Sequence, residues 1–246
     1  MEDKITKDHN AKGVVLLSGG MDSCAIAAEA IAYGYELAAL TFDYGQLHRK
    51  EVEKASLIAR EMVIPHRIAE LKFVKQLFGN KSTLLSGKVE AYKPLAEGEV
   101  ATSYVPLRNT IFLSIAAGLA ETIEADNIFI GANFVDYGGY PDCRKGYLEQ
   151  VRHALMLGSE RWTTGGHVLK IHHHENRTKE QIVIAGIANH APFEHTWSCY
   201  KGLERPCLHC DSCHNRTKGF MYAGVPDPAL TEDEWARAVQ LYEGSR

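Results

Sequence analysis

Two serines, two glycines and one aspartate stand together in the segment Ser18-Gly19-Gly20-Met21-Asp22-Ser23, directly after the apolar run of residues 13–17. Successive glycines let a backbone take positive φ and approach an anion closely, and amide groups at the start of a helix face phosphate oxygens. The hydroxyl groups of Ser18 and Ser23 add hydrogen-bond donors. The Asp22 carboxylate would repel phosphate unless it holds Mg²⁺ between itself and the phosphate oxygens. The segment therefore predicts a site for a phosphate group and Mg²⁺.

This hexapeptide is not a Walker loop, because the chain has no G-x-x-x-x-G-K-[ST] pattern. It resembles the S-G-G-x-D-S signature of the PP-loop, or N-type ATP pyrophosphatase, superfamily. The resemblance implies cleavage of ATP between the α- and β-phosphates, release of pyrophosphate, and transfer of AMP to a carboxylate or carbonyl oxygen. An ordinary tight turn would explain the two glycines alone, but not the whole hexapeptide between a strand and a helix.

Four of the six cysteines crowd into one short stretch, at Cys199, Cys207, Cys210 and Cys213. In a reducing compartment such spacing favours a metal over disulfides, and four thiolates complete the tetrahedral shell of a structural Zn²⁺ site. An iron–sulfur cluster is the rival interpretation, but nothing else in the sequence indicates electron transfer. His209 and His214 are interleaved and are expected to be solvent-facing spacers, because four cysteines already fill the metal shell. We therefore predict structural zinc.

The residues that carry this chemistry need a scaffold, and the hydrophobic pattern predicts alternating strands and helices. Short apolar runs predict strands at residues 13–17, 37–42 and 127–131, and the less apolar segments 66–69 and 168–171 are interpreted as further, weaker strands. Helical spacing predicts helices at residues 22–33, 51–62, 109–124, 146–161, 178–189 and 231–242, the last opened by the capping-box pattern of Thr231 and Glu234. This alternation predicts an α/β fold with a parallel, Rossmann-like sheet flanked by helices.

Residues 71–105 break this alternation, because they are polar and show no sustained period. A segment of that length in a compact domain is often a functional insertion or lid. We therefore predict a PP-loop ATP pyrophosphatase domain at residues 1–190, which contains this insertion, and a small zinc-binding C-terminal region with a terminal helix at residues 191–246.

Composition narrows the class of protein. The 246 residues are 45% hydrophobic, which suffices for a buried core, and the formal net charge is −4. This charge gives no broad basic surface, so no nucleic-acid partner is expected. No apolar run approaches the roughly 20 residues of a membrane span, and the first residues lack the apolar stretch of a signal peptide. We expect a cytoplasmic protein.

Four further segments carry a more specific pattern, at residues 42–48 (FDYGQLH), 105–110 (VPLRNT), 136–144 (DYGGYPDCR) and 196–200 (TWSCY). Together with the hexapeptide and the cysteines, in this order, they resemble the QueC family of 7-cyano-7-deazaguanine (preQ0) synthases over residues 13–222. The resemblance implies a PP-loop fold and a reaction between 7-carboxy-7-deazaguanine, ATP and ammonia. In this reaction the carboxylate is adenylated, ammonia displaces AMP to give the amide, and a second adenylation leads to the nitrile.

The resemblance also implies roles for individual residues. The ATP phosphates are held by Ser18, Gly19, Gly20, Met21, Asp22 and Ser23, and the adenine site is lined by Leu17, Thr41 and Phe42. Arg108 meets a phosphate or the substrate carboxylate, with a surface salt bridge as the alternative, and joins Ser18, Asp22 and Ser23 as a catalytic residue. The deazaguanine pocket is formed by Asp136, Tyr140, Asp142, Cys143 and Arg144. Within it, Cys143 is a small lining residue, with a nucleophilic role as the alternative.

Three features depart from the family pattern. Leu107 stands where most members have glycine, and Leu208 stands where the first C-x-x-C usually has glycine. The run His172-His173-His174-Glu175 replaces a usual Pro-Leu pair, and is expected to be a solvated run or, alternatively, a changed edge of the active site. QueC-like paralogues occur in antiphage gene clusters, and some look adapted to couple the activated deazaguanine to a protein amine. A ligase with a protein acceptor is therefore the alternative function.

Two other classes of protein are alternatives, a tRNA-binding PP-loop protein and a nonenzymatic zinc scaffold. The acidic net charge argues against the first, and loss of turnover in the variant Asp22→Ala would exclude the second. No glutaminase motif is visible, so free ammonia is the expected nitrogen source. Members of the family often pair, so a homodimer is an expectation, although no periodic interface stripe supports it.

Overall fold

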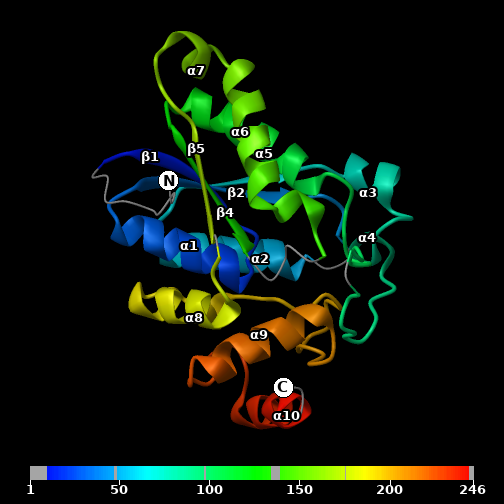
Figure 1. Cartoon of the computed structure of the whole chain (residues 1–246). Helices are drawn as coiled ribbons and strands as arrows, with labels where there is room; N and C mark the ends of the chain where they lie inside the picture. The colour runs from blue at the N-terminus through cyan, green and yellow to red at the C-terminus, as the bar shows by residue number, and fades with distance from the viewer. Residues whose placement is uncertain (1–9, 47–48, 97, 134–138, 175, 244–246) are drawn as a thin grey trace.

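A five-stranded parallel sheet forms the centre of the molecule (Figure 1). This computed structural model describes residues 10–46, 49–96, 98–133, 139–174 and 176–243. The strands are β1 (Lys12–Leu16), β2 (Glu36–Asp43), β3 (His66–Glu70), β4 (Asn127–Asn133) and β5 (Lys170–His174), in the spatial order β3-β2-β1-β4-β5. The predicted parallel α/β fold is confirmed, and each predicted strand is present with bounds shifted by a few residues.

Helices cover both faces of the sheet because the central strand is apolar on both sides. Val14 and Leu16 of β1 pack in one core with the helices α5 (Arg108–Thr122) and α6 (Lys145–Leu157). Val15 belongs to the opposite core, with the helices α1 (Met21–Ala32), α2 (Lys50–Glu61) and α8 (Lys179–Ala188). Successive side chains of a strand point to opposite faces, and each such buried side chain contributes about 1.5–3 kcal/mol.

The strand order reverses beside β1, and this reversal determines where the site lies. The chain runs from β1 outward to β2 and β3, and then returns to place β4 on the other side of β1. Ligands of open α/β sheets bind in the crevice at the carboxyl ends of the strands at such a switch point. The hexapeptide Ser18–Ser23 follows β1 at this place.

Two predictions about helices are corrected by the structure. The helix predicted at residues 146–161 is two helices, because α6 ends at Leu157, with Gly158 as its C-cap, and α7 (Glu160–Thr164) begins after it. The region of residues 71–105 contains two short helices, α3 (Phe73–Phe78) and α4 (Thr83–Ser86), and is otherwise irregular. The short 3₁₀ helices η2 (Pro141–Cys143) and η3 (Phe193–His195) complete the connections around the site.

The C-terminal region adds a helix that the sequence pattern did not predict. This helix, α9 (Asp211–Tyr222), packs on α8 on one side and on α10 (Glu232–Tyr242) on the other (Figure 1). The predicted capping box of α10 is confirmed, since the Thr231 hydroxyl accepts from the Glu234 amide at 3.3 Å and the Glu234 carboxylate accepts from the Thr231 amide at 2.9 Å. The division into two domains near residue 190 stays a prediction.

The three-histidine run is not a solvated loop. All three histidines belong to β5, and His172 and His174 are buried. His172 stacks on Phe129 with ring centroids 4.6 Å apart, and its Nε2 lies 3.0 Å from the side-chain oxygen of Asn127. The solvated interpretation is therefore wrong for these two positions. Glu175, which ends the run, lies outside the described residues.

Candidate active site and metal centre

A cavity of about 230 Å³ lies at the carboxyl ends of β1, β2 and β4. Predicted site residues that line it are Leu17, Ser18, Gly20, Met21, Asp22, Ser23, Phe42, Arg108, Tyr140 and Cys143. They come from four separate stretches of the chain, which the parallel sheet brings together. The structure thus places the predicted phosphate loop, the start of α5 and residues 140–143, which we call the PDC turn, around one space.

Four other predicted residues do not line the cavity. Gly19 belongs to the loop but faces α2, and Thr41 is buried beneath the loop, where its hydroxyl donates to the Leu17 carbonyl at 2.5 Å. Asp142 is buried behind the residues that line the cavity, and Arg144 is exposed directly before α6. Asp136, the remaining predicted substrate residue, lies outside the described residues.

The phosphate loop is held by its own serine side chains. The Ser23 hydroxyl donates to the Gly20 carbonyl at 3.0 Å and accepts from the Ser18 amide at 3.1 Å. The N-cap residue of α1 is Gly20, which has no side chain to cap the helix. The first amide groups of a helix need partners, and the helix dipole favours an anion there. The arrangement therefore suits a phosphate group.

Asp22 is the charged centre of this loop. One carboxylate oxygen, Oδ2, accepts from the Lys179 ammonium at 2.8 Å. The other, Oδ1, is buried and has no hydrogen-bond partner among the described residues. His174 donates to the Asp22 main-chain carbonyl at 2.9 Å, and burial lowers the pKa of His174, so its ring stays neutral. An unpartnered buried oxygen is costly, and a hard cation would satisfy it.

Lys179 was not predicted as a site residue, although it lines the cavity and only 11% of its side chain is exposed. It stands at the first position of α8, directly after the capping residue Thr178. A cation at a helix N-terminus is unfavourable because the dipole is positive there. A lysine at this position of a helix is locally unfavourable, and locally unfavourable residues concentrate at functional sites. The position of Lys179 in the sequence could therefore have indicated a functional role.

We expect Lys179→Ala to raise the KM for ATP at least about tenfold, because a charge-assisted contact contributes about 1.5–3 kcal/mol. The measurement is steady-state kinetics with ATP as the varied substrate. Lys72→Ala is the control, since Lys72 pairs with Glu70 at 2.8 Å on the open surface. An unchanged KM for ATP in the Lys179 variant would show that this lysine does not contact ATP.

Arg108 brings a fixed positive charge to the cavity from the first position of α5. Burial acts to lower the pKa of Arg108, but the neighbouring Tyr44 and Asp142 outweigh it and raise the pKa, so the guanidinium stays charged. Asp142 also accepts from the Asn109 amide at 2.9 Å, and the Asn109 side chain donates to the Asp142 carbonyl at 3.1 Å. Asp142 therefore ties the PDC turn to the start of α5 and supports Arg108 from behind.

Glu51 is a second cavity residue that sequence reasoning missed, and it comes from the first turn of α2. Burial raises the pKa of Glu51 from 4.5 to about 7, and the charge of Arg108 offsets this only in part. The folded protein therefore retains a proton here that the unfolded chain releases. This contribution to stability is complete below pH 4.5 and is lost as the pH rises through about 7.

We therefore expect Glu51→Gln to be more stable than the wild type at about pH 8, by about 1–3 kcal/mol, and nearly equal to it at about pH 5. Chemical denaturation of both proteins at the two pH values measures the difference. A gap of the same size at both values would contradict a raised pKa for Glu51.

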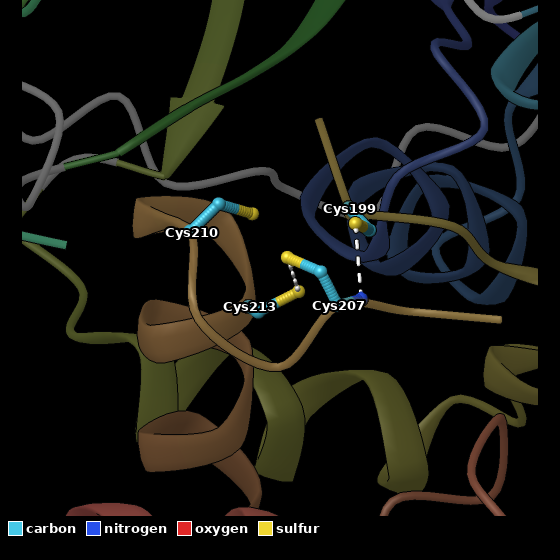
Figure 2. Close-up of side chains that lie close together, drawn as sticks. All are labelled: Cys199, Cys207, Cys210 and Cys213. Atoms are coloured by element: carbon cyan, nitrogen blue, oxygen red, sulfur yellow. Dashed lines mark hydrogen bonds between the residues drawn. The ribbon is translucent and has the colours of Figure 1, made fainter. Parts of the chain in front are cut away.

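The four cysteines converge, as predicted, at the start of α9 (Figure 2). Their sulfur atoms all lie within 4.8 Å of one another, and the Cys207 amide donates to Cys199 Sγ at 3.3 Å. Tetrahedral ligands at the usual Zn–S distance lie about 3.8 Å apart, so the four sulfurs fit one metal ion. Cys210 directly precedes α9 and Cys213 lies in its first turn.

The two histidines within the stretch differ. His209 is exposed, in line with the prediction of a spacer. His214 is buried, so the solvent-facing prediction is wrong for it. Its ring stacks on Tyr92 at a centroid distance of 3.6 Å and meets Tyr242 edge-on at 4.6 Å. His214 thereby joins the insertion and α10 to the cysteine cluster.

The sequence profile described as "Queuosine biosynthesis protein QueC" matches residues 12–224. The chain belongs to the QueC family. It is 44% identical over 220 residues to "7-cyano-7-deazaguanine synthase" of Thermoplasma acidophilum, covering 88% of this chain and 90% of the relative. It is 40% identical over 236 residues to the protein of that name from Archaeoglobus fulgidus, covering 96% of both. Among solved structures, NMN synthetase from Francisella tularensis is similar with a TM-score of 0.48 and 13% identity, covering 97% of this chain and 86% of that one.

Two departures from the QueC pattern share one backbone feature. Leu107 has φ of 51° and Leu208 has φ of 61°, both in the left-handed region. Glycine adopts that region freely, whereas leucine there costs about 1–2 kcal/mol. Leu107 directly precedes Arg108, which lines the cavity, and Leu208 directly follows Cys207 of the cysteine cluster. The backbone of this QueC member thus keeps the turns that glycine would favour.

The described part of the chain contains no helix that is long and apolar enough to cross a membrane.

Proposed function

We propose that this QueC protein is a 7-cyano-7-deazaguanine synthase. It adenylates 7-carboxy-7-deazaguanine with ATP, aminates the product with ammonia to the amide, and converts the amide to the nitrile. The relatives of that name, at 40% and 44% identity over most of the chain, support this reaction. The observation that carries the proposal is that the phosphate loop and the PDC turn line the same cavity.

The first step activates a poor electrophile. A carboxylate does not react with ammonia because oxide would have to leave, whereas in the mixed anhydride AMP leaves. Loop amides and the Ser18 hydroxyl donate to the phosphates, Ser23 holds the shape of the loop, and Lys179 adds a positive charge beside the phosphates. A Mg²⁺ ion at Asp22 Oδ1 would supply the positive charge that the departing pyrophosphate needs. These groups act where charge develops in the transition state.

The cavity also offers places for the two ring systems. Leu17 and Phe42 line the part next to the end of β1 and β2, where we place adenine. Phe42 stacks on Phe112 with a centroid distance of 4.0 Å, which presents a flat apolar wall. We place the deazaguanine against Tyr140 and Cys143, with its carboxylate toward Arg108. In this arrangement the carboxylate meets the α-phosphate between the two ends of the cavity.

The cysteine cluster is proposed to hold structural Zn²⁺, because four thiolates leave no open coordination position for a substrate. The alternative in which a protein amine receives the activated deazaguanine has no support from the relatives reported above, which are both named as the synthase. Free ammonia is the proposed nucleophile. A homodimer stays a prediction.

An isotope experiment tests the proposed chemistry. The acid substrate, labelled with ¹⁸O in both carboxylate oxygens, is incubated with the protein, ATP, Mg²⁺ and ammonium, and AMP is analysed by mass spectrometry. Each adenylation transfers one substrate oxygen to AMP, so label in AMP is expected. Unlabelled AMP would mean that water, and not the substrate, attacks the α-phosphate.

A further inference from the structure

The phosphate loop is held from outside by one backbone hydrogen bond. The Trp197 amide donates to the Gly19 carbonyl at 2.8 Å. On the other side the loop meets α2 so closely that a Cβ at position 19, where φ is 85°, would lie 2.1 Å from the Glu51 carbonyl oxygen. The Gly19 backbone is therefore enclosed between α2 and residues 196–199, which we call the Trp197 segment.

This hydrogen bond fixes the direction of the Gly20 N–H within the phosphate loop. In a trans peptide the carbonyl and the following N–H point in opposite directions. With the Gly19 carbonyl held by Trp197, the Gly20 N–H points back into the loop, 3.3 Å from the Ser18 hydroxyl. If the carbonyl were released, glycines on both sides would let this peptide rotate. A rotated peptide would present an oxygen, and not an N–H, to a bound phosphate.

The Trp197 segment is in turn part of the cysteine cluster. It ends at Cys199, one of the four converging thiols, and the Trp197 indole N–H donates to the Cys199 carbonyl at 2.8 Å. Lys50 of α2 lies over the indole ring, 4.5 Å from its centroid, and donates to the Glu204 carbonyl at 2.6 Å in the loop that leads to Cys207. The indole is thereby fixed between the cluster and α2.

Arg216 holds the same segment from α9, three residues beyond Cys213. Its guanidinium donates to the Thr196 hydroxyl at 2.7 Å and to the Ser198 hydroxyl at 3.3 Å. The remaining donors reach both oxygens of Asp227, at 2.5 and 2.7 Å. Arg216 and Asp227 are 8% and 0% exposed, so a displaced guanidinium would leave buried charge unsatisfied. A saturated buried network of this kind has one preferred geometry.

We propose that the Trp197 segment couples the cysteine cluster to ATP binding: the metal-loaded cluster and Arg216 set the peptide orientation of the phosphate loop. Arg216 itself also lines the cavity, and we assign it the role of a positioning residue that acts through Thr196 and Trp197. The inference rests on the proposed function only in so far as the loop binds ATP. It gives the metal centre a second role beside stabilising the fold.

The test compares ATP binding in two matched variants, Arg216→Lys and Arg161→Lys. Arg161 also forms a bidentate pair, with Asp126 at 2.7 and 2.8 Å, but it belongs to α7. Calorimetry with Mg²⁺ and a non-cleavable ATP analogue measures Kd, elemental analysis measures the metal, and hydrogen exchange follows the Trp197 amide. We expect Arg216→Lys to keep its metal, bind the analogue at least about tenfold more weakly and exchange the Trp197 amide faster. The control should match the wild type in all three.

An Arg216→Lys protein that retains its metal and binds the analogue within about twofold of the wild type would overturn the coupling. If that variant does not fold, Thr196→Val removes only the hydroxyl that Arg216 contacts and is judged by the same criteria. Removal of the metal by a chelator should weaken ATP binding reversibly, and unchanged binding by a folded metal-free protein would also overturn it. A wild-type protein that binds no ATP analogue would instead refute the proposed function.

Discussion

Asp22→Asn is expected to lower kcat/KM by about 10²–10³-fold, the largest effect on activity of any single change considered. The substitution keeps the shape of the side chain but removes the charge that pairs with Lys179 at 2.8 Å and the oxygen that is buried without a partner. Loss of one preorganised group at developing charge typically costs this factor. Steady-state release of pyrophosphate at several Mg²⁺ concentrations measures it.

The control for Asp22 is Asp126→Asn. Asp126 also accepts from a cation, Arg161, but it lies at the start of β4 and away from the cavity. This control should lose stability and keep turnover per folded molecule. A normal kcat/KM in the Asp22 variant would remove the aspartate from the mechanism, and with it the reason for placing Mg²⁺ there.

Cys213→Ser is expected to have the largest effect on stability, a loss of about 4 kcal/mol or more together with the bound metal. Metal affinity contributes directly to folding free energy when the ligands converge only in the folded state. Cys213 lies in the first turn of α9, whose polar sequence provides a weak apolar face, so the helix depends on the cluster and on Arg216. Thermal unfolding with parallel elemental analysis measures both losses.

Cys24→Ala is the control for the cluster. Cys24 belongs to the buried face of α1, and burial raises the pKa of its thiol, so it is an inert packing group. This variant should keep the metal and lose little stability.

The untreated protein should contain about one zinc per chain, and iron with visible absorbance would refute the zinc assignment. Full metal content in Cys213→Ser would contradict the four-cysteine site.

The parallel sheet could be predicted from the sequence because its three central strands, β1, β2 and β4, are short apolar runs. The phosphate loop and the cysteines could be predicted because each set is contiguous or nearly so along the chain. In contrast, α9 was missed because its buried residues include Arg216 and Thr217, which carry no hydrophobic period. Its packing depends on the Asp227 pair and the cysteines, which are tertiary contacts.

Two residues of the cavity could not be predicted for the same reason, namely that their positions depend on tertiary contacts. Glu51 and Lys179 belong to helices that are separate in sequence from the phosphate loop, and only the folded sheet brings them to the cavity. A polar run such as His172–His174 reads as a surface until Phe129 and Asn127 of the neighbouring strand are placed beside it. The predicted roles of Asp142 and Arg144 concern direct substrate contact, and the structure puts both behind or outside the cavity wall.

The proposed conversion of 7-carboxy-7-deazaguanine to the nitrile can be measured in a single assay. The purified protein is incubated with ATP, Mg²⁺, ammonium and 7-carboxy-7-deazaguanine, and the deazaguanine products and AMP are quantified together by mass spectrometry. We expect transient amide, final nitrile and two AMP formed for each nitrile, because each carboxylate oxygen leaves on one AMP. Release of AMP with neither amide nor nitrile would contradict it.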